Sequence, residues 1–127
     1  MPPNGFGTAL RKLRERRTLS VRELSTLAKL DHAYEYRLET SEKTNPSDEA
    51  MDKLIRALKP NDRDARMFRW LAEHPDTDTD FVVYALDDQS VTIEEFTAGA
   101  AMVHRGNIQP NPAKIIERVR RILSEEQ

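Results

Sequence analysis

The sequence predicts an all-α fold. Apolar residues recur three and four positions apart along nearly the whole chain, and no segment sustains the alternation of apolar and polar residues typical of a half-buried strand. The chain has 127 residues, of which 38% are hydrophobic and 33% are charged. This size and balance fit one domain, or one small domain with a short appendage.

The composition excludes several classes of protein. The chain has no cysteine, which excludes disulfides, thiolate nucleophiles and cysteine-based zinc sites. No apolar stretch approaches the ~20 residues of a membrane-spanning helix, and the opening residues show no signal-peptide pattern. No set of catalytic groups is recognisable either. We therefore expect a cytoplasmic protein without membrane association, enzymatic activity, metal ion or cofactor.

Helix start and stop signals divide the chain into eight segments. Capping boxes formed by Ser20 with Glu23 and by Thr92 with Glu95 mark two helix starts, and Asn111 followed by a proline marks another. The expected helices cover 5–17, 20–28, 32–40, a fourth from Ser47 to Pro60, a fifth after Asn61, 79–86, 93–104 (closed by Gly106) and a last one from 112 onward.

The polar segment from Pro75 to Thr79 is the best internal boundary, with one domain at 1–74 and a helical region at 75–127. Charge differs between the two parts of the chain. Residues 1–60 carry 12 Lys/Arg and 9 Asp/Glu, whereas residues 61–127 carry 8 and 13. A basic first half is compatible with a polyanionic partner, and ordinary surface variation is an equally good explanation.

The stretch from Leu10 to Leu58 carries a more specific pattern. Residues 19–28 are Leu-Ser-Val-Arg-Glu-Leu-Ser-Thr-Leu-Ala, and residues 31–39, after a short turn, are Asp-His-Ala-Tyr-Glu-Tyr-Arg-Leu-Glu. Asn-Pro-Ser follows at 45–47. Over about residues 6–58 this order and spacing resemble the helix-turn-helix of Xre/Cro-like regulators, the phage-repressor type. The resemblance implies a five-helix lambda-repressor-like domain whose helix 32–40 enters the major groove of double-stranded DNA.

The resemblance also implies which residues contact DNA. Arg37 is expected to bind a phosphate or a guanine, and the alternative is an ion pair with Glu39 or Glu42. Arg14 and Arg17 are expected on the surface, with long-range attraction to DNA as the alternative. The positions that match the family's DNA contacts are Ser20, Arg22, His32, Ala33, Tyr34, Tyr36, Arg37, Lys43, Thr44 and Asn45.

Four positions depart from the family pattern. Val21 replaces a glutamine, which removes a polar contact to the DNA backbone, and Lys29 and Ser41 replace glycines. If Lys29 keeps a left-handed conformation, a steric cost follows. The largest departure is Glu35, where the family has a buried Ile or Val, because a buried carboxylate is costly unless it is paired.

Three outcomes are open for Glu35. It finds a partner such as Arg37 or Lys53, or the helix rotates so that Tyr34 or Tyr36 fills the core, or the fold is strained there. In the preceding helix, 20–28, we expect Leu24, Leu27 and Ala28 to be buried.

The last helix is the best candidate for an interface between two copies of the chain, since operators are read by two-fold dimers. The alternative is that its apolar face packs within the chain. The expected dimer residues are Ile115, Ile116, Val119, Ile122 and Leu123.

Two functional hypotheses follow. The first is a sequence-specific, homodimeric repressor of its own or neighbouring genes. The second is a protein-interaction module with weak or lost DNA binding, such as an antitoxin that binds a toxin. In some repressors of similar layout a partner metallopeptidase cuts the C-terminal region, and here the loop from Met102 to Pro112 would be the cut site.

Overall fold

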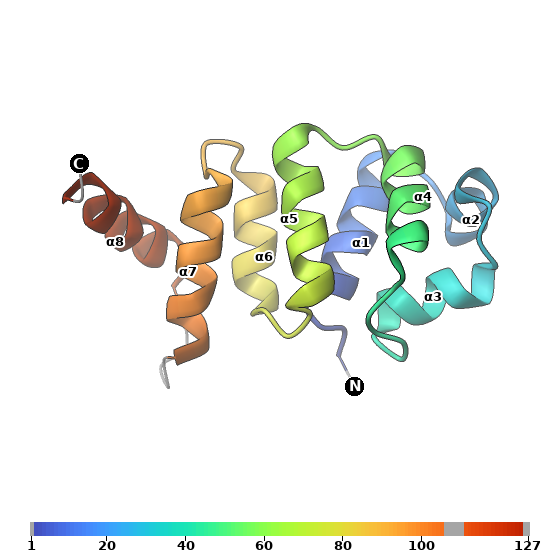
Figure 1. The fold of residues 1–127 in the computed structure, drawn as a ribbon, viewed down its shortest axis with the longest axis horizontal. Helices are drawn as coiled ribbons and strands as arrows, with labels where there is room; N and C mark the ends of the chain where they lie inside the picture. The colour runs from blue at the N-terminus through green and yellow to red at the C-terminus, as the bar shows by residue number, and fades with distance from the viewer. Residues whose placement is uncertain (1, 106–110, 126–127) are drawn as a thin grey trace.

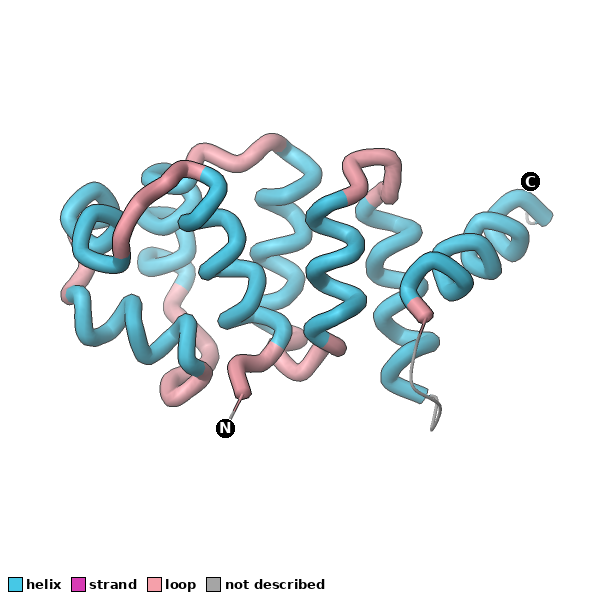
Figure 2. The backbone as a smooth tube through the Cα atoms, turned by 180° about the vertical axis from the view of Figure 1, so that it is seen from behind, coloured by secondary structure: helices cyan, strands magenta, loops and turns pink. Residues whose placement is uncertain are grey.

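The computed structural model describes residues 2–105 and 111–125, and all regular structure in these ranges is α-helical. The all-α prediction is therefore confirmed for the described residues (Figure 2). The predicted stop at Gly106 lies outside them, as do residues 106–110 of the predicted cut site, whereas residues 102–105 of that segment are helical. The helices are α1 (Gly5–Arg16), α2 (Val21–Ala28), α3 (His32–Thr40), α4 (Asp48–Leu58), α5 (Asp62–Glu73), α6 (Thr79–Asp87), α7 (Ile93–Arg105) and α8 (Pro112–Glu125).

Side-chain caps fix several of the helix starts, as the sequence predicted. At α2 the Glu23 amide donates to the Ser20 hydroxyl at 3.0 Å, and the Ser20 amide donates to the Glu23 carboxylate at 2.8 Å. Thr92 and Glu95 make the same reciprocal pair at the start of α7. These bonds satisfy amides that have no partner inside the helix. In the described part of the chain, no helix is long and apolar enough to cross a bilayer.

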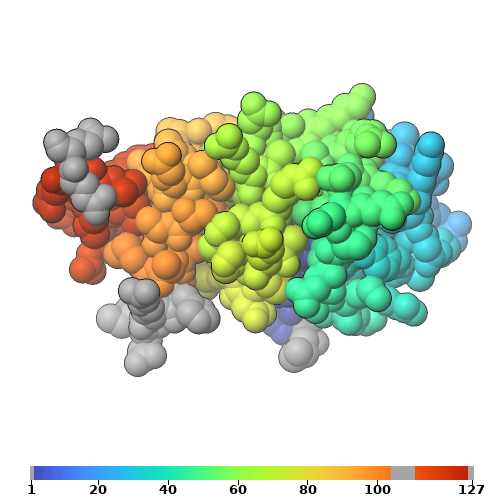
Figure 3. All heavy atoms as spheres, in the orientation of Figure 1, coloured from blue at the N-terminus to red at the C-terminus, as the bar shows by residue number. Residues whose placement is uncertain are grey.

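The molecule is elongated, with α2 and α3 at one end and α8 at the other (Figures 1 and 3). Helix α1 is central, because it packs against α3 on one side and against α5 and α6 on the other. Helix α8 crosses the far end and packs on α6 and α7. The helix-turn-helix segment is thus built onto one side of α1, and the later helices onto the other.

One hydrophobic core runs through both parts of the chain. Phe6 of α1 stacks on Phe68 of α5, with ring centroids 4.9 Å apart, and Phe81 of α6 stacks on Phe96 of α7 at 5.5 Å. All four rings belong to the same buried cluster. The segment 75–79, predicted as the domain boundary, lies against α1, since the Phe6 amide donates to the Pro75 carbonyl. The division into domains at 1–74 and 75–127 stays a prediction, and both parts contribute to this one core.

A buried ion cluster also joins α1, α5 and the end of α6. The Asp64 carboxylate accepts from Arg16 at 2.7 Å and from Arg63 at 3.0 and 2.7 Å. The Asp64 side chain is 3% exposed. Arg63 also donates to the carbonyls of Asp88 and Val91, which follow α6. The two guanidinium groups therefore hold the turn between α6 and α7 against the helices of the first part.

The prediction that Leu27 is buried is wrong. Its side chain is 54% exposed, whereas Leu24, Ser25 and Ala28 are buried. The buried stripe of α2 passes through Ser25, whose hydroxyl donates to the Val21 carbonyl and so needs no solvent. Leu27 falls outside this stripe because a short helix against two neighbours buries only a narrow face.

Candidate nucleic-acid interface

The surface expected to read DNA lies at the end of the molecule opposite α8 (Figure 1). Three segments form it: the first turn of α2, the outer face of α3, and the loop that joins α3 to α4. None of the ten predicted DNA-contacting residues is buried, and eight of them are exposed. The two half-buried ones are Ala33 and Tyr34.

The turn between α2 and α3 adopts the tight geometry that the motif requires. Lys29 is left-handed, with φ 57° and ψ 43°, in the position where the family has glycine. Its amide donates to the Thr26 carbonyl at 3.2 Å, and the Leu30 amide donates to the Ser25 carbonyl at 2.9 Å. These two bonds form a Schellman motif, which ends one helix and redirects the chain into the next. The expected steric cost at Lys29 follows from its positive φ.

Helix α3 has an exposed polar face and a buried, partly acidic face. Arg37 is exposed and makes no ion pair with any described residue, so the alternative of a pair with Glu39 or Glu42 is wrong. Glu39 is instead bonded to Arg14. Both exposed aromatic and cationic groups are therefore available to a partner. The exposed side chains of α3 are His32, Tyr36 and Arg37.

The buried face of α3 is anchored to α1. Arg14 donates two parallel bonds to the Glu39 carboxylate, at 2.8 and 3.0 Å, and a third to the Leu19 carbonyl at 2.8 Å. This bonding raises the pKa of Arg14, chiefly through the bond to Glu39. Arg14 is therefore neither a surface residue nor a source of long-range attraction. Arg17 is exposed, as expected, and its guanidinium donates to the Ala57 carbonyl of α4.

Gly7 allows the backbones of α1 and α3 to approach closely. A Cβ atom at Gly7 would lie 2.4 Å from the backbone oxygen of Glu39, which is closer than real contacts allow. At the end of α3 the Asn4 amide donates to the Ser41 hydroxyl at 2.8 Å. Together with the Arg14 bonds, these contacts fix the C-terminal half of α3.

Glu35 lies on the same buried face, one turn before Glu39. Its side chain is 0% exposed, and no described donor reaches either carboxylate oxygen. Neither Arg37 nor Lys53 pairs with it, and α3 has not rotated, since Tyr36 is 54% exposed. Burial, followed by the neighbouring Glu39, raises the pKa of Glu35 to about 9. This shift favours the protonated form of the carboxyl at neutral pH.

The loop after α3 places further polar groups beside the helix. Ser41, where the family has a terminal glycine, is left-handed with φ 68°, and Asn45 has φ 55°. The Lys43 amide donates to the Arg37 carbonyl at 3.1 Å, and the Lys43 ammonium lies 5.5 Å from the centre of the Tyr34 ring. This cation–π contact holds the ammonium next to the outer face of α3. Desolvation raises the pKa of Tyr34, which keeps its hydroxyl neutral.

Several cations of this surface are not paired with any described acidic side chain. Among the described residues, Arg22, Lys29, Arg37 and Lys43 have no carboxylate partner, and all four lie on α2, α3 or the loops at their ends. In α1, by contrast, Arg14 and Arg16 are bonded to buried carboxylates, and Arg11 and Lys12 pair with acids on the surface. The amides in the first turn of α2 add partial positive charge beside Ser20. The interface thus draws its charge from a few unpaired side chains.

The predicted dimer residues lie at the other end of the molecule. Ile116 and Val119 are buried within the chain, 1% and 2% exposed, in agreement with the alternative of intramolecular packing for these two. Ile115 and Leu123 are half-buried, and Ile122 is 41% exposed. Only the outer edge of the predicted dimer face therefore remains on the surface.

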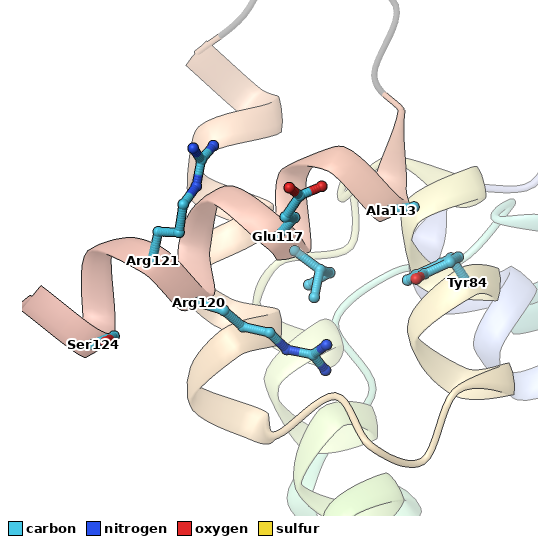
Figure 4. Close-up of a pocket in the computed structure, with 7 residues that line it drawn as sticks. Tyr84, Ala113, Glu117, Arg120, Arg121 and Ser124 are labelled. Carbon is cyan, nitrogen blue, oxygen red and sulfur yellow. The ribbon is translucent and has the colours of Figure 1, made fainter.

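A surface pocket of about 350 Å³ lies beside α8, on the side facing α6. Tyr84 faces Ala113 across it, and Glu117 and Arg121 project from the outer side of α8 (Figure 4). Arg120 is engaged, because it donates to Glu95 at 3.0 Å. This pocket is remote from α3 and contributes nothing to the surface at the opposite end.

Comparison with known families decides what the first part of the chain is. A family model described as a helix-turn-helix domain matches residues 6–66. Residues 6–66 are therefore similar to a helix-turn-helix domain. The match is consistent with the Xre/Cro-like resemblance and covers α1 to α4 with the start of α5. No similar protein was found among curated proteins or among solved structures. Such a domain is typical of DNA-binding regulators.

Two residues that organise the helix-turn-helix domain were missed by the sequence reasoning. Glu39 was considered only as a partner of Arg37, and Arg14 only as a surface charge. A signal was available, since an acidic residue on the inner face of α3 needs a cation from a neighbouring helix. Their spacing in the sequence does not identify Arg14 as that cation, because the two residues are brought together only when α1 packs on α3.

Proposed function

We propose that the protein is a sequence-specific DNA-binding transcriptional regulator that represses its own or neighbouring genes as a homodimer. One observation carries the proposal: α3 is fixed from behind by Arg14 while its outer face offers His32, Tyr36 and Arg37 to solvent. A rigid helix with exposed donors is what the major groove accepts. These observations support DNA binding by the helix-turn-helix domain. The homodimer is a separate part of the proposal.

Each segment of the surface has a distinct role in the proposed complex. Arg37 can donate two parallel bonds to one guanine, or bind a phosphate, from the middle of the groove. Arg22 and the free amides at the start of α2 contact phosphates beside the N-terminal end of the motif. Lys43, in the loop that follows α3, contacts a phosphate beyond the C-terminal end of that helix. Phosphate contacts set the register, and α3 supplies the discrimination between bases.

A dimer is required because one short helix reads too few base pairs. The exposed edge of α8 around Ile122 lies far from α3 (Figure 1), so a second copy bound there leaves both recognition helices free. Two copies related by a two-fold axis would read an inverted repeat, with half-sites about 34 Å or a multiple of it apart.

The test measures binding of the purified protein to its own promoter DNA and to random duplex of equal length, by fluorescence anisotropy at two salt concentrations. We expect preference for the promoter and a loss of affinity with salt, because bound phosphates release counterions. Arg37→Ala is expected to lower promoter affinity at least tenfold, whereas Arg66→Ala, which removes an exposed cation of α5, is the matched control. A folded protein with equal affinity for both duplexes would contradict the proposal.

A second candidate is an interaction module that binds a toxin or a metallopeptidase. The acidic balance of residues 61–127 and the exposed acids Asp31 and Glu42 beside the reading surface favour it, because both oppose tight DNA binding. Purification together with the product of the neighbouring gene, in a fixed ratio and without promoter binding, would support this candidate over the first.

A further inference from the structure

Two buried carboxyl groups share a single cation beneath the recognition helix. Glu35 and Glu39 lie one turn apart on the inner face of α3, 0% and 6% exposed. Arg14 from α1 is the cation, and both of its bonds to a carboxylate go to Glu39. From α2, which also packs on α3, no described titratable side chain bears on Glu35. The charges at this site therefore balance only if one carboxyl is neutral.

The geometry identifies which carboxyl that is. Glu39 receives two strong bonds from a guanidinium, which favours its ionised form. Glu35 receives none, and both of its oxygens are without a donor. A carboxyl that has no donor and is 0% exposed cannot be kept ionised cheaply, whereas a protonated one is itself a donor and can bond to an adjacent carboxylate.

We propose that Glu35 carries a proton that it donates to the Glu39 carboxylate, and that this carboxylic acid–carboxylate–guanidinium chain is what holds α3 at the angle needed to read DNA. Glu35 is thus a positioning residue, and the chain makes the reading surface sensitive to proton loss at one buried atom. The second part of this inference rests on the proposed function; the first part, on the proton, does not.

The position of Glu35 on the helix explains the coupling. Ionisation would put two negative charges beside one guanidinium, away from water, and the helix could relieve this only by turning Glu35 outward. Such a turn carries residues of the outer face inward, because all side chains rotate with the same backbone. Tyr36 and Arg37 would then leave the positions in which they face a partner.

The raised pKa of Glu35 agrees with this arrangement, since burial and the Glu39 carboxylate both favour the neutral form. The proton would therefore remain in place at neutral pH. The same contacts predict that alkaline conditions, rather than acidic ones, release the helix.

The first arm of the test follows side-chain carboxyl carbons by NMR in the free, full-length protein between pH 5 and pH 10. Glu35→Gln assigns the signal, and Glu35→Leu assigns it if the first variant does not fold. We expect Glu35 to be protonated at pH 7 and to titrate above pH 8, while the amides of Tyr36 and Arg37 shift with the same midpoint. A Glu35 carboxylate that is ionised at pH 7, or Tyr36 and Arg37 amides that ignore its titration, would overturn the proposal.

The second arm measures promoter affinity at pH 7 and pH 9.5. We expect the unmodified chain to lose at least tenfold in affinity over this range and Glu35→Gln to change less than threefold, because the amide keeps an N–H donor and cannot ionise. Glu42→Gln makes the same chemical change at an exposed residue just after α3 and should follow the unmodified chain. Equal pH profiles for Glu35→Gln and Glu42→Gln would overturn the positioning role. Absence of promoter binding at every pH, with the expected NMR titration, would contradict the proposed function and leave the proton chain intact.

Discussion

Asp64 is expected to be the most sensitive charged residue outside the reading surface. Its carboxylate is 3% exposed and neutralises two guanidinium groups, those of Arg16 and Arg63. Replacing Asp64 by Asn keeps the size of the side chain and removes its charge. Arg63 would then keep no carboxylate partner among the described residues, and Arg16 would keep only Asp87, at 3.9 Å. Leaving a buried cation without its counter-ion is what makes a broken buried pair costly.

The structure allows the size of the effect to be worked out. Breaking a buried pair typically costs about 3–5 kcal/mol. Arg16 is 36% exposed and can turn to solvent, whereas Arg63 is 13% exposed but keeps its bonds to the carbonyls of Asp88 and Val91. Both facts place the loss at the lower end, about 3 kcal/mol. With a urea m-value of about 1.5 kcal/mol/M, the unfolding midpoint falls by about 2 M.

The assay is urea unfolding at pH 7, followed by circular dichroism. Asp62→Asn is the matched control, because Asp62 lies two residues earlier in the same first turn of α5 and is exposed. We expect the control to move the midpoint by less than about 0.5 M, in keeping with the small effects of exposed charges. A loss below about 1 kcal/mol for Asp64→Asn would refute the view that this cluster holds the two parts of the chain together.

Three further predictions concern the helix-turn-helix domain. Gly7→Ala places a methyl group 2.4 Å from the Glu39 backbone oxygen and should lower the free energy of unfolding by roughly 1–3 kcal/mol, measured by urea unfolding. Lys29→Gly removes a left-handed lysine with φ 57° and should raise that free energy by about 1 kcal/mol in the same assay. Glu35 has a pKa of about 9 in the folded chain and 4.5 in the unfolded chain, so the folded state binds its proton more tightly. The stability gained in this way is complete below pH 4.5 and is lost as the pH rises towards about 9. Unfolding at pH 7 should therefore require about 3 kcal/mol less than at pH 4.5, and Glu35→Gln should remove the difference.

Local signals in the sequence were sufficient to predict the helices. The capping boxes at Ser20 and Thr92 act within four residues, so their chemistry is visible in the sequence and the structure contains both. The left-handed conformation of Lys29 was an open condition in the sequence, tied to the glycine of the family pattern, and the structure contains it. The family match at residues 6–66 agrees with the resemblance that these local patterns indicated.

Long-range partners could not be predicted in this way. Arg14 and Glu39 are far apart in the chain, and only the packing of α1 on α3 brings them together. The exposure of Leu27 has a related cause, since the width of the buried stripe on α2 depends on which helices cover it. The state of Glu35 was open for the same reason, because Arg14, the cation that pairs with the neighbouring Glu39, comes from another helix.

Helix α1 connects these observations. The sequence presents it as a basic surface helix, yet Arg14 is bonded towards α3, Arg16 towards α5 and α6, and Arg17 towards α4. The positive balance of residues 1–60 therefore overstates the charge that a nucleic acid can meet. In the proposed complex the cations around α3 contact DNA, so the affinity depends on the angle at which α3 presents them and not on net charge alone. That angle is set by α1, and α1 is in turn fixed to the later helices through Asp64. Glu39 and Asp64 both bind arginines of α1. A substitution at either of them should therefore change the position of α3, although neither residue lies on the surface proposed to contact DNA.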